Sequence, residues 1–154
     1  PRAEYTGLQT CKAAGSLSSG PKGCRFGCLG FGDCVAQCKF GALSINEFGL
    51  AQIDADKCIG CGACAKACPR NLIALQPVSN HTIAIALCRN MEKGKAVRDV
   101  CMKGCISCRL CEKNCPEGAI DCSSGVAVIN PLLCKGCGIC QEKCPTKAIV
   151  MHEK

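Results

Sequence analysis

The sequence has few aromatic residues and no long apolar run. It contains no Trp, one Tyr and four Phe among 154 residues, so side chains alone offer little bulk for a core. The longest apolar stretch, Thr82 to Cys88, is about a third of the length of a membrane-spanning helix. We expect no signal peptide within these residues, and because the chain begins at Pro1 without Met we expect an excised segment of a longer protein.

Cysteine, in contrast, is abundant. The chain has 20 cysteines, about 13% of its residues, a level that indicates a disulfide scaffold or a metal protein. Sixteen of them stand in four runs, mostly at intervals of two or three residues, which is too close for unstrained disulfides between neighbours. We therefore predict reduced, metal-binding thiols in a protein that faces the cytosol.

Three of the four runs share the spacing C-x2-C-x2-C-x3-C-P. They are residues 58–69, 105–116 and 134–145. This is the spacing of bacterial ferredoxins, where thiolates hold [4Fe–4S] clusters and the fourth cysteine of each run ligates the other cluster. Proline fixes its own φ and moves the preceding cysteine out of the helical region, so each short helix should end at that cysteine.

The first run departs from this spacing. Its cysteines are separated by three, five and three residues, and Lys39 stands where the other runs have Pro. We interpret it as a longer loop, bent at its glycines, that still contributes four thiolates. A three-iron cluster, which needs only three, is the alternative.

These runs predict four [4Fe–4S] clusters with exchanged fourth ligands. The sets are Cys24, Cys28, Cys34 and Cys68; Cys58, Cys61, Cys64 and Cys38; Cys105, Cys108, Cys111 and Cys144; and Cys134, Cys137, Cys140 and Cys115. The four remaining cysteines, which we interpret as small buried hydrophobes, are Cys11, Cys88, Cys101 and Cys122. Cys101 is an alternative ligand to Cys105, because its spacing repeats that of Cys24 and Cys28. Zinc is a weaker interpretation, since a four-cysteine site needs two C-x2-C pairs a dozen or more residues apart.

The formal charge of +7 counts every cysteine as neutral. Four oxidised clusters of about −2 each would bring the protein to about −1, which removes the main support for nucleic-acid binding. A local basic stretch remains, either as a solvated face or as a docking surface for an acidic redox partner: Arg89, Lys93, Lys95, Arg98, Lys103 and Arg109. His81 and His152 stand alone and are expected to be structural or exposed. We find no nucleotide-binding loop and no catalytic triad, so no side chain is assigned a catalytic role.

The chain is expected to be α+β, with two tandem ferredoxin-like modules. A polar, flexible lead at 1–21 precedes module 1 at 22–76, a linker occupies 77–101, and module 2 follows at 102–154. Each module contains one hairpin between its two runs, predicted at 42–53 and 119–129. The linker should contain a strand near 81–88 and a short helix within 95–101.

Three segments resemble the ferredoxin-type region of the B subunit of the Rnf complex. They are residues 4–14, residues 20–34 with the widened first run, and residues 94–106 with Gly94-Lys-Ala-Val-Arg98 leading into Cys101-Met-Lys-Gly-Cys105-Ile. The resemblance covers essentially the whole chain. It implies a part in a membrane-bound, ion-translocating ferredoxin:NAD oxidoreductase, at the cytoplasmic face of the membrane.

In that family the B subunit is implied to take electrons from soluble ferredoxin and to pass them to other subunits. Its membrane helix and its further cluster domain have no counterpart in these residues, so we expect a soluble piece with no membrane span. One alternative is a polyferredoxin-like subunit of a soluble oxidoreductase, such as a hydrogenase or a 2-oxoacid oxidoreductase, which would lack the segments 4–11 and 20–34. The other, of a different class, is a non-redox metal-binding interaction module.

Overall fold

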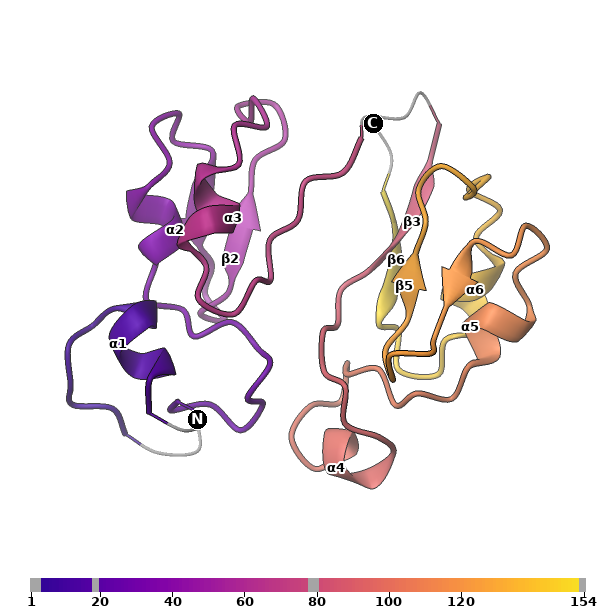
Figure 1. Ribbon diagram of the computed structural model, residues 1–154, viewed down its shortest axis with the longest axis horizontal. Coiled ribbons are helices and arrows are strands. Elements are labelled where there is room, and N and C mark those ends of the chain that lie inside the picture. Colours follow the sequence, from indigo (N-terminus) through magenta and orange to yellow (C-terminus); the bar gives the residue numbers. More distant parts are fainter. Residues whose placement is uncertain (1–3, 18–19, 78–80, 153–154) are drawn as a thin grey trace. The chain divides into compact units, whose positions relative to one another are not determined.

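The computed structural model describes residues 4–17, 20–77 and 81–152, which form two compact units (Figure 1). Unit 1 comprises Pro1–Leu75 and unit 2 comprises Gln76–Lys154, and each contains two of the cysteine runs. Short helices and antiparallel strands make the chain α+β, as the sequence predicts. The segment 77–101, which we predict to be a linker, falls within unit 2.

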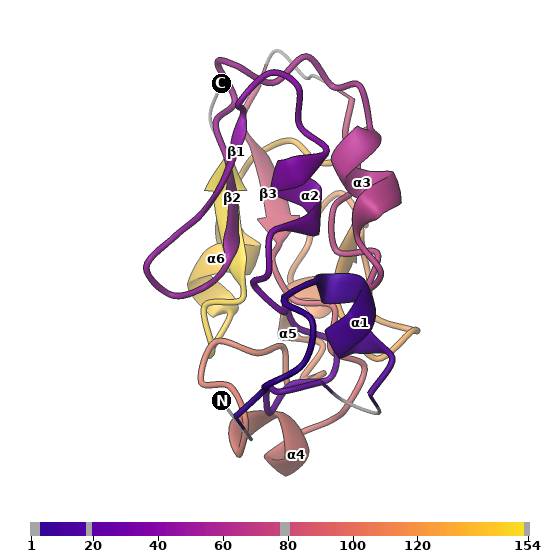
Figure 2. The same cartoon turned by 90° about the vertical axis from the view of Figure 1, so that its left-hand side faces the viewer.

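The described residues of unit 1 form three short helices and one hairpin, which Figure 2 labels. The elements are α1 (Cys11–Gly15), α2 (Asp33–Ala36), β1 (Leu43–Ile45), β2 (Ala51–Ile53) and α3 (Ala63–Ala67). β1 and β2 are antiparallel, with Leu43 opposite Ile53. Asn46 closes their turn, since its Oδ1 accepts hydrogen bonds from the amides of Phe48 and Leu50, both at 3.0 Å. The hairpin lies between the two runs, as predicted.

The α1 helix lies within the segment for which composition predicts a flexible lead. The Thr10 hydroxyl caps its first turn by accepting a bond from the Ala13 amide at 3.2 Å. The carboxylate of Asp33 accepts bonds from the amides of Cys11 at 2.7 Å and Lys12 at 3.0 Å. These contacts with a distant residue order the segment, although residues 18 and 19 of the predicted lead lie outside the described residues.

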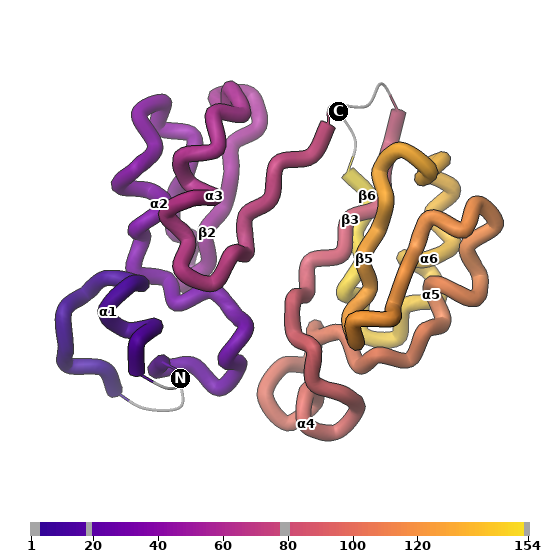
Figure 3. Tube along the Cα trace, viewed as in Figure 1, coloured from indigo at the N-terminus to yellow at the C-terminus, as the bar shows by residue number. Residues whose placement is uncertain are grey.

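Unit 2 contains a second pair of strands in addition to its hairpin. Its elements are β3 (Ile83–Ala86), α4 (Lys95–Arg98), α5 (Leu110–Lys113), β4 (Ile120–Asp121), β5 (Val128–Ile129), α6 (Ile139–Lys143) and β6 (Ile149–His152). β4 pairs with β5, and β3 pairs antiparallel with β6, the last strand of the chain. The trace in Figure 3 shows the chain leaving β3 and turning through α4 before it reaches α5. The strand and helix predicted within 77–101 are both present.

The largest apolar core lies in unit 2. Its buried members include Ile83, Ala84, Ile120 and Ile149, which surround Cys111, Cys122, Cys134 and Cys140. In unit 1 a smaller cluster joins Cys11, Ala14 and Leu29 to the partly buried rings of Tyr5 and Phe31. In both units cysteines are part of the core, which places sulfur where an ordinary domain would have hydrocarbon.

Candidate metal centres

All four cysteine runs share one backbone framework, which is built around the third cysteine. The residues four and two positions before it have positive φ in every run: Gly30 and Gly32 at 85° and 79°, Gly60 and Gly62 at 71° and 77°, Ser107 and Arg109 at 58° each, and Gly136 and Gly138 at 71° and 77°. A helix then begins one residue before the third cysteine, in α2, α3, α5 and α6. Two left-handed residues in such close succession bend the loop tightly toward the helix that follows.

This framework corrects our interpretation of the first run. Counted back from the third cysteine, Cys28 occupies the place of the first cysteine in the other runs, and Phe31 occupies the place of the second. The loop is therefore not lengthened. A phenylalanine has replaced one cysteine, and Cys24 has been added upstream, four residues before Cys28.

The turn after the fourth cysteine is also repeated. The residue three positions later has positive φ in each run: Gly41 at 61°, Asn71 at 50°, Gly118 at 58° and Lys147 at 54°. In three runs the next amide donates to the cysteine sulfur: Leu72 to Cys68 at 3.5 Å, Ala119 to Cys115 at 3.4 Å and Ala148 to Cys144 at 3.3 Å. Cys68 and Cys144 are extended, with ψ of 109° and 112°, which confirms the predicted effect of the following proline.

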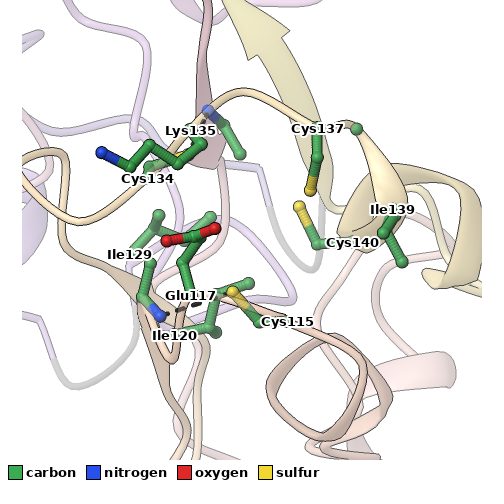
Figure 4. A pocket seen from close by; sticks show the side chains of 12 residues that line it. Cys115, Glu117, Ile120, Ile129, Cys134, Lys135, Cys137, Ile139 and Cys140 are labelled. Carbon is green, nitrogen blue, oxygen red and sulfur yellow. Dashed lines mark hydrogen bonds between the residues drawn. The ribbon is translucent and has the colours of Figure 1, made fainter.

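A cavity in unit 2, here cavity 1, is bordered by cysteines of both runs of that unit. Its walls include Cys115 from the earlier run together with Cys134, Cys137 and Cys140 from the later one, and its apolar lining includes Ala84 and Ile129. Figure 4 shows the sulfurs of Cys137 and Cys140 directed toward each other, with Cys115 on another wall. The structure thus brings together one complete predicted set, including its exchanged fourth member.

A second cavity, cavity 2, brings together another complete set. Cys105, Cys108 and Cys111 come from the earlier run of unit 2, and Cys144 comes from the later one. Cys88 and Cys122, which lie outside the runs, line it as well. The Sγ atoms of Cys122 and Cys111 are 3.9 Å apart, and the Cys88 sulfur accepts a bond from the Asn90 amide at 3.4 Å. Our interpretation of these two thiols as small buried hydrophobes is therefore incomplete, because both make polar contacts.

In unit 1, Arg70 connects the two runs. It follows Cys68 and Pro69, and its Nη1 donates to the carbonyls of Cys24 at 3.2 Å and Gly27 at 2.6 Å. This contact holds the segment next to Cys68 against the turn that carries Cys24. The second set is less enclosed, because Cys58 and Cys61 are exposed while Cys38 and Cys64 are partly buried.

A constant spacing that we missed in the sequence relates the extra cysteines of the two units. Cys11, Cys24 and Cys28 are each followed 77 residues later by a cysteine, at Cys88, Cys101 and Cys105. The turns correspond too, since the Gly27 amide donates to the Cys24 carbonyl at 3.2 Å and the Gly104 amide to the Cys101 carbonyl at 3.3 Å. Cys101 is therefore the counterpart of Cys24 in sequence position and turn geometry, and its predicted role as an alternative ligand to Cys105 stays a prediction.

Burial and hydrogen bonds shift the pKa of several cysteine thiols. Burial raises the pKa of Cys34 and Cys111, and it raises the pKa of Cys140 to about 11. Cys144 is buried as well, but bonds from the Ala148 amide and from Thr146 outweigh this and lower its pKa. Metal binding must therefore displace protons from the buried third cysteines.

The donor set of both cavities fits an iron–sulfur cluster better than a single metal ion. Within the described residues, no three His, Cys, Asp or Glu side chains converge as they would on one ion. The cavities present sulfur as their shared ligand atom, and thiolates are the ligands of iron–sulfur clusters. His81 and His152 are exposed, as predicted, and the His81 ring lies 2.8 Å from the Cys134 carbonyl. In the part of the chain that the structure describes, no helix has the length and apolarity to cross a bilayer.

Repeated cysteine loops, each leading into a short helix, define an iron–sulfur protein of the ferredoxin class. Residues 23–72 and 57–119 match the 4Fe-4S dicluster domain, and residues 127–150 match the 4Fe-4S binding domain. The chain belongs to the 4Fe-4S dicluster domain family.

Three relatives that match most of this chain are B subunits of ion-translocating complexes of the Rnf type. The chain is 45% identical over 104 residues to the B subunit of the Na(+)-translocating ferredoxin:NAD(+) oxidoreductase complex of Acetobacterium woodii, a match that covers 68% of this chain and 31% of the relative. It is 45% identical to the proton-translocating counterpart of Clostridium ljungdahlii, over 85% of this chain and 45% of that one. It is 44% identical to the B subunit of the ion-translocating oxidoreductase complex of Methanosarcina acetivorans, over 95% and 54%. The chain thus spans about half the length of these relatives or less.

Proposed function

We propose that the chain carries four [4Fe–4S] clusters and relays electrons from reduced ferredoxin to other subunits of a membrane-bound, ion-translocating complex of the Rnf type. It would work at the cytoplasmic face of the membrane. The ligands are the four sets predicted from the sequence. In the first set Cys24 takes the role of the second cysteine of the other runs, because Phe31 stands at that position. The partners come from the names of the relatives, which describe subunits of ferredoxin:NAD(+) oxidoreductase complexes.

One observation carries the proposal above the others. Cavities 1 and 2 each combine three cysteines of one run with the fourth cysteine of the other run. A chain that used each run for a separate metal ion would have no reason to exchange these residues. Exchange is the arrangement of two-cluster ferredoxins, and it places two redox centres close together in one small unit.

Each bound cluster would supply one-electron redox chemistry, and the side chains would make and break no bonds. The chain's residues hold the thiolates in place and surround them with apolar groups such as Ala84, Ile129 and Ile149. The amides of Leu72, Ala119 and Ala148 donate to the sulfurs of fourth cysteines and stabilise negative charge there. Burial and these hydrogen bonds are the means by which the protein adjusts the potentials.

Iron and sulfide analysis of anaerobically purified protein tests the cofactor content. We expect about sixteen iron atoms and sixteen sulfides per chain, and an electron paramagnetic resonance signal after reduction. A content near eight would contradict the four sets, and zinc without a paramagnetic signal would favour the non-redox interaction module.

Reduction kinetics test the proposed partner separately. Reduced ferredoxin should transfer electrons to the loaded chain, and the loaded chain should bind other subunits of the complex. If the clusters are present but ferredoxin does not reduce them, the chain is better assigned to a soluble oxidoreductase with another electron donor.

A further inference from the structure

Cys122 lies beside a ligand of cavity 2 without belonging to any run. It follows β4, is 5% exposed and lines cavity 2. Its Sγ lies 3.9 Å from the Sγ of Cys111, a distance at which one sulfur can donate a hydrogen bond to the other. Under the proposed function Cys111 is a ligand and has lost its proton. Cys122 is then the donor of the pair, because a thiolate has no hydrogen to give.

The position of Cys122 occurs in all four runs, but only the third run has a thiol there. Seven residues after the fourth cysteine the other runs have Ile45, Leu75 and Met151. At least two of these lie over the same part of their own loop: a Cβ on Gly32 would be 3.7 Å from Ile45, and one on Gly62 would be 3.3 Å from Leu75. The third run is therefore the one of the four with a hydrogen-bond donor at this position.

A local clamp, also specific to the third run, fixes the backbone of Cys122. The Glu112 carboxylate accepts the Cys122 amide through Oε1 at 3.0 Å and the Arg109 Nε through Oε2 at 2.6 Å. Glu112 directly follows Cys111, and the corresponding residues of the other runs are Val35, Ala65 and Gln141. Glu112 and Arg109 therefore act as positioning residues that hold Cys122 next to Cys111.

Arg109 adopts an unfavourable conformation in this clamp. Its φ of 58° falls in the left-handed region, where the other three runs have glycine at Gly32, Gly62 and Gly138. A side chain in this region is a source of backbone strain. The hydrogen bond from Arg109 to Glu112 compensates for the backbone strain of an arginine at this position.

We propose that Cys122 donates an S–H hydrogen bond to the Cys111 sulfur and thereby raises the reduction potential of the cluster held by Cys105, Cys108, Cys111 and Cys144. A hydrogen bond to a ligand sulfur offsets negative charge, so it favours the reduced state, which has one more electron. One electron is added and no proton moves, because Cys122 keeps its hydrogen in both states. Electrons that enter unit 2 would then collect at this cluster before its neighbour in cavity 1.

Redox titration of the loaded full chain, followed by electron paramagnetic resonance, tests this with three variants. Cys122→Ala removes the donor, and Cys122→Ser keeps a donor of similar size. Met151→Ala is the matched control at the corresponding position of the other cluster in unit 2. We expect Cys122→Ala to lower the equilibrium constant for reduction of the cavity 2 cluster about tenfold, which is about 59 mV for one electron. Cys122→Ser should restore most of that loss, and Met151→Ala should leave this potential unchanged.

Three results would overturn the inference: an unchanged potential in Cys122→Ala, equal shifts in the Ala and Ser variants, or a loss of a quarter of the iron in Cys122→Ala, which would make Cys122 a ligand. Infrared spectroscopy of the unaltered chain gives a second measurement that needs no stable variant. An S–H stretching band should shift when the protein is reduced. The absence of such a shift would also count against the hydrogen bond. Failure of the proposed function is distinct, since the unaltered chain would then lack the sixteen iron atoms.

Discussion

The two units contain the same cysteine loops but differ in the size of the apolar core that supports them. In unit 2, β3 and β6 pair over a core that contains Ile83, Ala84 and Ile149. The corresponding segments of unit 1, residues 6–9 and 73–75, form no strands. Gly7 stands where unit 2 has Ala84, and glycine weakens a strand and adds no side chain to the core.

This difference separates what the cysteines determine from what the rest of the sequence determines. The loops have the same pattern of positive φ in both units, although unit 1 lacks the second sheet in its described residues. The loops therefore do not depend on the second sheet. The neighbouring apolar segments determine how much structure a unit has without its clusters.

Removal of iron should produce the largest difference between the two units. After anaerobic chelation we expect amide hydrogens of β1 and β2 to lose their protection from exchange, because unit 1 has little core besides its cysteines. The amides of β3 and β6 should keep a measurable part of theirs, since Ile83 and Ile149 remain packed. Hydrogen exchange with mass spectrometry measures both. Equal loss in the two units would show that the additional sheet does not stabilise unit 2 alone.

The role of Cys24 as a ligand can be tested by moving the cysteine to position 31. Cys24→Ser should lose one cluster, about four of the sixteen iron atoms, and adding Phe31→Cys should restore them because residue 31 has the place of a second cysteine. Iron analysis and paramagnetic resonance give the count. The matched control in unit 2 is Cys101→Ser, which should keep all iron because Cys108 is present. If Phe31→Cys restores nothing, the correspondence of the loops does not extend to ligation.

The basic residues of α4 should affect the rate of electron entry more modestly. Lys95 and Arg98 are exposed, and we predict that reversing both to Glu slows reduction by ferredoxin at low ionic strength. The effect should fade as salt is added, because exposed charges are screened. Reversal of Lys57 and Lys66 in unit 1 serves as the control. A rate and a salt dependence that stay the same would make α4 an ordinary solvated surface.

Lys39 should have the smallest effect. It is exposed and directly follows Cys38, where the other runs have proline. A cation there favours the more negative reduced cluster, and the amide that proline lacks is able to stabilise it further. Lys39→Pro should therefore lower the potential of the cluster of Cys38, Cys58, Cys61 and Cys64 by roughly tens of millivolts. Lys39→Ala separates charge from amide, and an unmoved or raised potential in the proline variant would contradict the prediction.

Local sequence signals were enough to predict much of this structure. The hairpin of unit 1, the strand before Cys88 and the extended backbone at Cys68 and Cys144 depend on neighbouring residues, such as Pro69 after Cys68, and all are present. Iron–sulfur binding followed from the spacing alone. These features were predictable because their causes lie within a few residues.

The features that were missed depend on residues far apart in the chain. β3 pairs with β6, with Ile83 opposite His152, and α1 is held by the Asp33 carboxylate. The bond between Cys122 and Cys111 depends on a hairpin returning to its own loop. The correspondence of Cys11 with Cys88 is the exception, because the constant distance between the two sets of cysteines is visible in the sequence itself.

Both cavities of unit 2 are closed by residues from its two runs, so neither can be completed while the chain is only partly synthesised. Cavity 2 contains Cys105 and Cys144, and a ribosome needs seconds to translate the residues between them, at roughly 5–20 residues per second. During that interval Cys105, Cys108 and Cys111 are thiols without their fourth partner, open to oxidation. A complete cysteine set for cavity 2 therefore exists only after the later run has been translated, whereas both runs of unit 1 are complete before translation reaches unit 2.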